Sequence, residues 1–216
     1  PTQFAKIKKG DTVIDLGSGA GNDCFVARAA TGASGKVIGI DFTPAMVVKA
    51  KANAENLGYT NVEFRQGDID NMPVAADVAD VIVSNCVLNL VPNKSKVFKE
   101  MYRVLKPGGH FSISDIVLVG ELPDSLKKDA EMYAGCVAGA IQKEAYLELI
   151  QAGGFENIVL QKEKSIIIPA DILSNYLNEE EIEDFKTGNT GIFSITVYAE
   201  KPVEEKDTCC GSGCCQ

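Results

Sequence analysis

The chain has 216 residues, of which 45% are hydrophobic and 24% are charged, and its formal net charge is −9. This length suits one domain with a substantial core, and the sequence contains no run of about 18 apolar residues that would cross a membrane. The acidic balance lacks the clustered Lys and Arg of a nucleic-acid-binding surface. The first residues show no signal-peptide pattern, so we expect a cytoplasmic protein whose seven cysteines are thiols.

The first half of the sequence alternates short apolar runs, predicted as strands, with longer segments, predicted as helices. This alternation is typical of βαβ units and a parallel sheet. Strands are predicted over 13–14, 36–41, 62–66, 78–84 and 110–116, and helices over 22–31, 43–57 and 94–105. The first helix is expected to carry Phe25, Val26 and Ala29 on one apolar face. Residues 106–109, Lys-Pro-Gly-Gly, are expected to separate the third helix from the fifth strand.

The second half of the sequence interrupts this alternation twice. Residues 120–140 and 170–188 are predicted as small helical insertions, and the latter is expected to be helical over 171–186. A further helix is predicted over 143–151, with strands over 157–168 and 191–200. We therefore expect one domain over residues 1–200, followed by a flexible Cys-rich tail over 201–216.

The loop after the first strand has three glycines at alternate positions, Gly17, Gly19 and Gly21, and follows Asp15 closely. Such a loop lets backbone approach a ligand, and the candidates are a dinucleotide and S-adenosylmethionine. The dinucleotide fingerprint has the different spacing G-x-G-x-x-G. Asp15 would repel a pyrophosphate and attract the ammonium of a methionine group. Asp41, at the end of the second strand, suits ribose hydroxyls in either case.

Four motifs follow one another in the sequence: Asp-Leu-Gly-Ser-Gly-Ala-Gly at 15–21, Gly-Ile-Asp at 39–41, Gly-Asp at 67–68 and Leu-Lys-Pro-Gly-Gly at 105–109. Together they resemble the class I S-adenosylmethionine-dependent methyltransferases. The resemblance implies an α/β, Rossmann-like fold with a seven-stranded, mostly parallel sheet, helices on both faces and an antiparallel last strand. It also implies a set of cofactor-binding residues: Asp15, Gly17, Ser18, Gly19, Gly21, Asp41, Phe42, Met46, Asp68, Ile69 and Asn85.

Two thiols come from segments that lie far apart in the sequence. Cys86 follows the fourth strand within Ser-Asn-Cys-Val-Leu-Asn-Leu-Val, and Cys136 lies within Gly-Cys-Val-Ala-Gly-Ala in the first insertion. Paired thiols favour a soft, thiophilic substrate. Both segments resemble those of the arsenite methyltransferases, which implies that Cys86 and Cys136 are catalytic ligands of trivalent arsenic. The substrates implied are arsenite or methylarsenite with a thiol reductant, in arsenic detoxification.

The chemistry implied by this resemblance needs little acid–base catalysis. Thiolates would displace hydroxyl groups from arsenic, and the arsenic lone pair would attack the sulfonium methyl, so catalysis would be chiefly positioning and desolvation. The single histidine, His110, begins the fifth strand and is expected to be structural. Cys24, on the first helix, is expected to pack in the core.

Three questions stay open: the N-terminal ligand, the role of the tail cysteines and the acceptor. The arsenite methyltransferases have a further cysteine segment before the cofactor loop, where this sequence begins with Pro1, so we expect a truncated N-terminus that lacks this ligand. The tail cysteines, Cys209, Cys210, Cys214 and Cys215, are a second candidate site for metalloid, and the alternative is a solvated tail without a fixed role. The alternative functions are methylation of a small organic acceptor and thiol-based binding of a metalloid.

Overall fold

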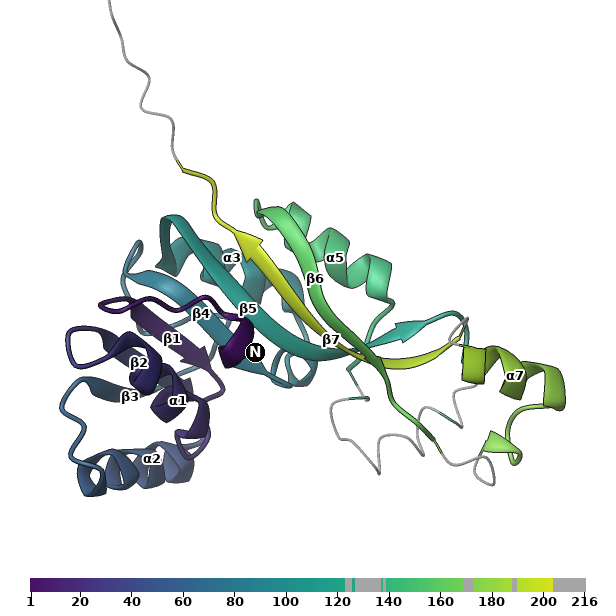
Figure 1. Ribbon diagram of the computed structural model, residues 1–216, viewed down its shortest axis with the longest axis horizontal. Helices are drawn as coiled ribbons and strands as arrows, with labels where there is room; N and C mark the ends of the chain where they lie inside the picture. The colour runs from purple at the N-terminus through teal and green to yellow at the C-terminus, as the bar shows by residue number, and fades with distance from the viewer. Residues whose placement is uncertain (123–125, 127–136, 138, 169–172, 188–189, 204–216) are drawn as a thin grey trace, which may run out of the picture.

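The computed structural model describes residues 1–122, 126, 137, 139–168, 173–187 and 190–203. These residues form a seven-stranded sheet in the order β3-β2-β1-β4-β5-β7-β6, in which β7 alone runs antiparallel to its neighbours (Figure 1). The predicted mostly parallel sheet is therefore confirmed. The strands are β1 (Thr12–Leu16), β2 (Lys36–Asp41), β3 (Val62–Gln66), β4 (Ala79–Asn85), β5 (Leu105–Val119), β6 (Glu156–Ser165) and β7 (Gly191–Glu200).

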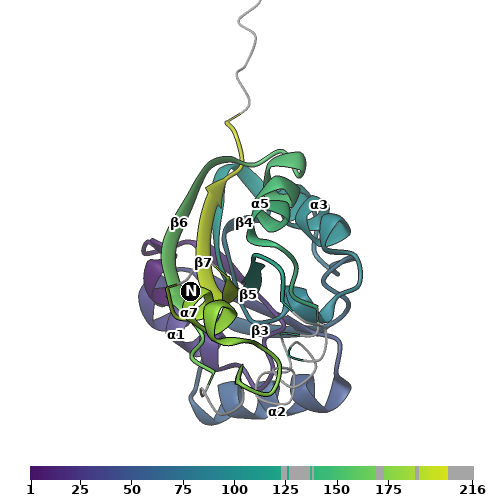
Figure 2. The same ribbon diagram turned by 90° about the vertical axis from the view of Figure 1, so that its right-hand side faces the viewer.

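Helices cover both faces of this sheet, with α1 on one side and α3 and α5 on the other (Figure 2). The described helices are α1 (Asn22–Thr31), α2 (Pro44–Asn56), α3 (Lys94–Val104), α5 (Lys143–Ala152) and α7 (Glu179–Thr187), with 3-10 turns η1 (Thr2–Phe4) and η2 (Leu88–Leu90). No helix in the described part of the chain is long and apolar enough to span a bilayer.

The two faces of the sheet are both apolar because β1, β2 and β4 are continuous hydrophobic runs, as buried parallel strands are. Successive residues point to opposite faces. Paired valines therefore contact α1 and α2, whereas paired isoleucines contact the layer of α3 and α5. These residues are Val13, Val37 and Val81 on the first face and Ile14, Ile38 and Ile82 on the second.

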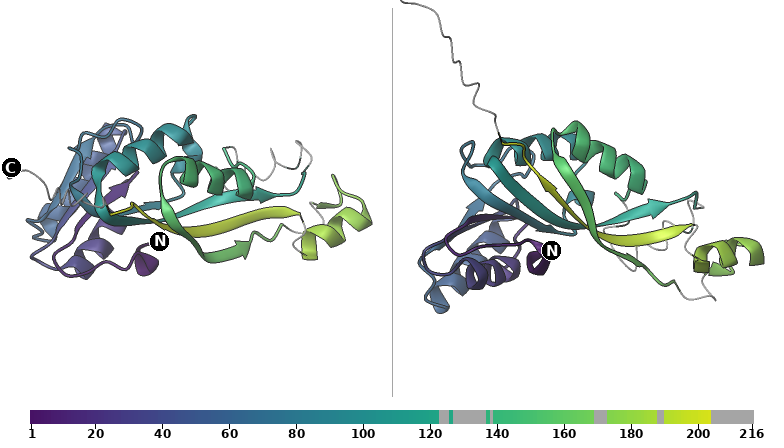
Figure 3. Two further views of the ribbon diagram at one scale, coloured as in Figure 1. Left: turned by 90° about the horizontal axis from the view of Figure 1, so that it is seen from above. Right: turned by 45° about the horizontal axis from the view of Figure 1, so that its top comes forward.

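Strands β5 and β7, with the end of β6 paired to β7, continue beyond the parallel strands as a long arm that reaches α7 (Figure 3). A third hydrophobic cluster covers this arm. It joins Ile116 and Leu118 of β5 to Ile192 of β7 and to Phe185 of α7. The arm thus has a core of its own, separate from the two cores that flank the parallel strands.

Lys201 links the end of β7 to the C-terminal end of α3 and to the segment before β4. Its side chain is 7% exposed, and its ammonium donates to the carbonyls of Leu105 and Tyr102 at 2.7 and 2.9 Å and to Asp77 at 2.8 Å. These two carbonyls lie at the C-terminal end of α3, where helical carbonyls lack partners within the helix. One lysine therefore caps α3 and holds the end of the sheet domain in place.

Three expectations from the sequence differ from the structure. The buried face of α1 consists of Cys24, Ala27 and Thr31. The predicted apolar face is wrong for Val26 and Ala29, which are exposed, whereas Phe25 is half-buried and packs against the core. Cys24, Ala27 and Thr31 are three and four residues apart, which is the spacing of one helix face. The N-cap Gly21 has a left-handed backbone, and this conformation directs the chain into the helix.

Strand β5 also begins earlier than predicted. Residues 106–109 belong to the strand, because Gly108 and Gly109 exchange backbone hydrogen bonds with Lys201 and Gly108 takes a φ of +78°. Helix α7 covers the second part of the predicted helix over 171–186, residues 177–178 are not helical, and residues 169–172 lie outside the described part. Most of the insertion predicted over 120–140 lies outside it as well.

Candidate functional site

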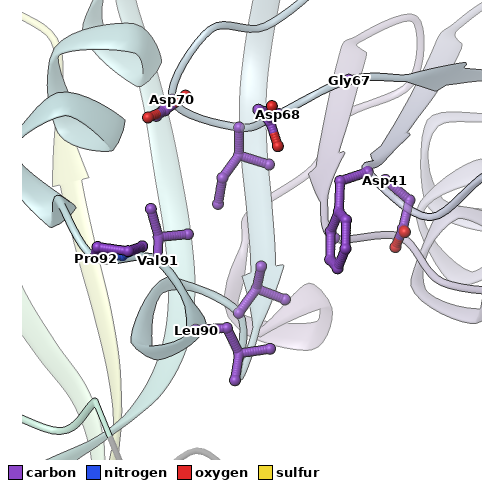
Figure 4. A pocket seen from close by; sticks show the side chains of 11 residues that line it. Asp41, Gly67, Asp68, Asp70, Leu90, Val91 and Pro92 are labelled. Atoms are coloured by element: carbon purple, nitrogen blue, oxygen red, sulfur yellow. The ribbon is translucent and has the colours of Figure 1, made fainter.

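A cavity of about 450 Å³ opens at the carboxyl ends of the parallel strands, where α/β proteins bind ligands. Segments that follow β1, β2, β3 and β4 contribute to it. The lining residues are Gly17, Asp41, Phe42, Gly67, Asp68, Ile69, Asp70, Val87, Leu90, Val91 and Pro92. Figure 4 shows Asp41 across the cavity from Val91 and Pro92, with Asp68 between them and Asp70 on the side of Val91 and Pro92. Carboxylates thus lie along the cavity, and apolar side chains from the segment after β4 close one side of it.

The three glycines of the loop at 17–21 are needed for different reasons. All three have positive φ, +68° at Gly17, +51° at Gly19 and +97° at Gly21. A Cβ at Gly17 would lie 2.5 Å from Val87 Cγ2, and one at Gly21 would lie 2.7 Å from Phe64 Cζ. At Gly19 a Cβ would have no neighbour within 4 Å. The loop is therefore pressed against the protein at both ends and open in the middle.

Asp41 connects this loop to the end of β2. Its Oδ2 accepts a hydrogen bond from Gly19 N at 2.9 Å, and its Oδ1 accepts one from Thr43 N at 2.8 Å. A carboxylate offers about four acceptor positions. Asp41 therefore orders the loop and still has acceptor capacity toward the cavity that it lines.

Asp15 lies beneath the loop on β1 and is 2% exposed. Burial raises the pKa of Asp15 to about 7, although the hydrogen bond from the Cys24 thiol at 3.2 Å opposes the shift, and the charges of Asp23 and Asp41 add to it. Burial and then Asp15 raise the pKa of Cys24 well above its usual value. Cys24 is fully buried, which confirms the prediction that it packs in the core.

A cofactor carrying a ribose and an ammonium group fits these residues. The Ser18 hydroxyl in the loop is buried without a hydrogen-bond partner among the described residues. The open space at Gly19, the acceptors of Asp41 and the buried carboxyl of Asp15 lie in or under the same loop. These groups are donors and acceptors suited to a polar ligand with a positive charge.

The remaining predicted cofactor residues divide into two groups. Phe42, 68% exposed, and Ile69, 7% exposed, line the cavity. Met46 is 41% exposed on the first turn of α2 and does not line it. The side chain of Asn85 lines a different hollow and donates to Asp23 Oδ2 at 3.3 Å. Five of the eleven predicted cofactor residues therefore line the cavity, namely Gly17, Asp41, Phe42, Asp68 and Ile69.

Cys86 lies directly after β4, beside the apolar side of the cavity. Its backbone has a φ of +57°, and its N–H donates to the Ser114 carbonyl at 2.8 Å. The next residue, Val87, both lines the cavity and contacts Gly17. Cys86 itself is not among the lining residues, but the residue that follows it in the chain contacts the glycine loop.

Cys136 and the four tail cysteines lie outside the described residues. Within the described part of the chain, no group of three or more His, Cys, Asp or Glu side chains is arranged to hold a metal ion. The described residue Gly139 lies three positions after Cys136, and a Cβ there would lie 1.8 Å from the Asn89 carbonyl oxygen. The segment that follows Cys136 therefore contacts the turn that follows Cys86.

Sequence reasoning singled out the segment 84–92 for its thiol and amides, but not for the apolar side chains of Val87, Leu90, Val91 and Pro92 that line the cavity. It missed a second group of residues near the site altogether. Asp115 and Tyr146 looked like ordinary strand and helix residues, yet the Tyr146 hydroxyl donates to Asp115 Oδ2 at 2.9 Å and both are buried. An aspartate within an apolar strand was the available signal. His110, by contrast, bonds the Ala5 carbonyl at 2.7 Å, as expected of a structural residue.

Comparison with known proteins agrees with this geometry. The family model described as "Methyltransferase domain" matches residues 7–154. The chain is 39% identical over 206 residues to an arsenite methyltransferase of Halobacterium salinarum, covering 95% of this chain and 50% of that protein. It is 38% identical over 152 residues to the arsenite methyltransferase of Homo sapiens, covering 66% of this chain and 40% of that protein.

Among solved structures, the fold resembles CrArsM, an arsenic(III) S-adenosylmethionine methyltransferase from Chlamydomonas reinhardtii. The TM-score is 0.74 at 33% identity, and the match covers 93% of this chain and 66% of that one. The chain spans about half the length or less of these two curated relatives. The matched family model covers more than half of the chain and includes the glycine loop, Asp41, Asp68 and Cys86, so the chain belongs to the methyltransferase domain family.

Proposed function

We propose that this chain binds S-adenosylmethionine in the cavity at the ends of β1 to β4 and methylates trivalent arsenic held by cysteine thiols. The observation that carries the proposal is the position of Cys86, one residue from Val87, which contacts the glycine loop. A soft ligand for arsenic thus lies next to the loop that a methyl donor would occupy. The similarity to arsenite methyltransferases along 95% of the chain supports the same substrate.

The residues around the loop have separate roles in this proposal. Gly17, Gly19 and Gly21 let the backbone approach the methionine part, and Ser18 donates its hydroxyl there. Asp41 accepts from the ribose hydroxyls. The bound cofactor supplies a methyl group on a positively charged sulfur.

Further residues complete the cofactor site. Burial raises the pKa of the Asp15 carboxyl to about 7. An ammonium group close to this carboxyl favours its ionised form. Asp68 and Ile69 bind the adenine edge, while Phe42 covers its face. Asn85 contributes its backbone, because its side chain is bonded to Asp23.

Cys86 and Cys136 hold the substrate in this proposal. Each thiol that binds arsenic replaces a hydroxyl group, which leaves as water with the thiol proton. The arsenic keeps its lone pair and needs no general base. The protein then has to position the arsenic in line with the methyl group and exclude water. Because methyl transfer takes arsenic from the trivalent to the pentavalent state, turnover also needs a thiol reductant, and the reducing cytoplasm suits both requirements.

The test measures methylated arsenic formed from arsenite, S-adenosylmethionine and a thiol reductant. The wild-type chain is expected to form product, and Cys86→Ser is expected to lose it, whereas Cys24→Ser is the matched control because a hydroxyl can donate the same bond to Asp15. Absence of product, together with equal arsenite binding by wild type and Cys86→Ser, would refute the proposal. Arsenite binding without turnover that is insensitive to Asp41→Ala would indicate a metalloid-binding protein, and turnover without arsenite would indicate an organic acceptor.

A further inference from the structure

A buried polar cluster lies behind the turn that follows Cys86. It consists of Asp115 on β5, Tyr146 on α5, Lys94 at the start of α3 and Asn89 in η2, all buried, and we call it the Asp115 cluster. The Tyr146 hydroxyl donates to Asp115 Oδ2 at 2.9 Å. Both α3 and α5 pack on the same face of the sheet (Figure 2). The cluster therefore joins the turn to three elements of the main core.

Asp115 accepts the Tyr146 hydrogen bond through Oδ2, whereas its Oδ1 is buried without a hydrogen-bond partner among the described residues. Burial raises the pKa of Asp115 to about 7, while the Tyr146 hydroxyl, the Lys94 charge and the nearby backbone N–H groups of Asn89 and Leu88 act to lower it. The carboxyl thus lies between α5 and the backbone of η2. Asn89 connects η2 to β5 by a hydrogen bond, in which its Nδ2 donates to the Ile116 carbonyl at 2.7 Å.

Lys94 and Gly139 hold the same turn from a third side. The Lys94 ammonium donates to the Gly139 carbonyl at 2.8 Å. A Cβ at Gly139 would lie 1.8 Å from the Asn89 carbonyl oxygen, so only glycine permits this approach. The turn after Cys86 is therefore enclosed by β5, by the start of α3 and by the segment that leads into α5.

Cys86 itself has a backbone conformation that needs such support. A φ of +57° lies in the left-handed region, which residues other than glycine rarely adopt, and it persists where the surrounding structure over-determines it. Burial, then Asp115 and then the charge of Cys86 raise the pKa of Tyr146. The Cys86 sulfur therefore lies within electrostatic range of the Tyr146 hydroxyl.

We propose that Asp115 and Tyr146 are positioning residues for the methyl acceptor: their hydrogen bond holds the turn after β4 so that the Cys86 thiol keeps a fixed place beside the glycine loop. This inference rests on the proposed function, in which Cys86 binds arsenic. It predicts that the pair affects the acceptor half of the reaction and leaves cofactor binding alone, because neither side chain lines the cavity.

The test uses Tyr146→Phe, which removes one hydroxyl and keeps the ring that packs edge-on against Phe98. The matched control is Tyr102→Phe on α3, whose ring packs against Phe155. Three quantities are measured on the full chain: the Kd for S-adenosylmethionine by calorimetry, the kcat of arsenite methylation, and the rate at which iodoacetamide alkylates Cys86, followed by peptide mass spectrometry. Thermal unfolding confirms that each variant is folded.

Tyr146→Phe is expected to leave the cofactor Kd within twofold, lower kcat by about tenfold to a hundredfold, and raise the alkylation rate of Cys86 several-fold, while Tyr102→Phe changes none of them. Asp115→Asn, which keeps an acceptor for the Tyr146 hydroxyl, is expected to retain more activity than Asp115→Ala. Equal behaviour of the two tyrosine variants, or a matching loss of cofactor affinity, would overturn the proposal. If no variant and no wild-type sample methylates arsenite but the alkylation rates change as expected, the positioning of Cys86 stands and the proposed reaction fails.

Discussion

Replacement of Gly17 by alanine is the sharpest test of how the glycine loop is built. The new Cβ would lie 2.5 and 2.6 Å from the two Cγ atoms of Val87, in a backbone with a φ of +68°. The left-handed conformation costs an alanine about 1–2 kcal/mol, and displacing a packed valine costs about 1–3 kcal/mol. Gly17→Ala is therefore expected to lower the free energy of unfolding by roughly 2–5 kcal/mol.

Gly19→Ala is the matched control, because its φ of +51° is also positive but a Cβ there meets nothing within 4 Å. It should cost only the conformational part, about 1–2 kcal/mol. Urea denaturation measures both variants, and the double variant Gly17→Ala/Val87→Ala should recover part of the loss, since the two Cγ atoms are gone. If Gly17→Ala is no less stable than Gly19→Ala, or if Val87→Ala gives no recovery, the contact between loop and turn is refuted.

Three further predictions concern charged groups. Asp41→Asn is expected to weaken S-adenosylmethionine binding at least about tenfold in calorimetry, because one of two acceptor oxygens is lost; unchanged affinity would remove Asp41 from the site. Lys201→Met is expected to cost about 2–4 kcal/mol in urea, since buried carbonyls lose their donor, whereas Lys36→Met, whose ion pair is exposed, should cost less than about 1 kcal/mol; equal losses would contradict this. Between about pH 4 and pH 7 the unfolded chain has lost the Asp15 and Asp115 protons that burial retains in the folded protein. Stability therefore falls as pH rises through this window, by up to about 1.4 kcal/mol per pH unit for each carboxyl; Asp115→Asn should reduce that slope, and an unchanged slope would refute it.

The parallel half of the sheet was predictable because its strands are uninterrupted apolar runs separated by glycine turns and helix signals. The buried face of α1 was not predictable, because Phe25 and Val26 are more hydrophobic than Cys24 and Thr31. The orientation of the helix is set by the backbone at Gly21. The start of β5 was also missed, because Lys-Pro-Gly-Gly is a helix-ending pattern whose pairing with Lys201 comes from a segment about 90 residues away.

The site followed the same division. Motif spacing located Gly17, Asp41 and Asp68, because their roles depend on short loops at strand ends. It could not show that Asn85 turns toward Asp23, or that Asp115 lies within range of Lys94. Those contacts depend on which strands and helices become neighbours, and that is a property of the tertiary structure.

The anchoring of Lys201 has a consequence for the cysteines beyond it. Lys201 N bonds the Gly109 carbonyl, whereas Cys86 N bonds the Ser114 carbonyl, five residues further along β5, or about 17 Å. The chain therefore leaves the sheet at the amino ends of the parallel strands, opposite the carboxyl ends where Cys86 lies. Cys209 is eight residues beyond Lys201, a connection that spans at most about 29 Å. Any path from the tail cysteines to Cys86 has to lead around the sheet, so the distance along β5 is only a lower bound on its length.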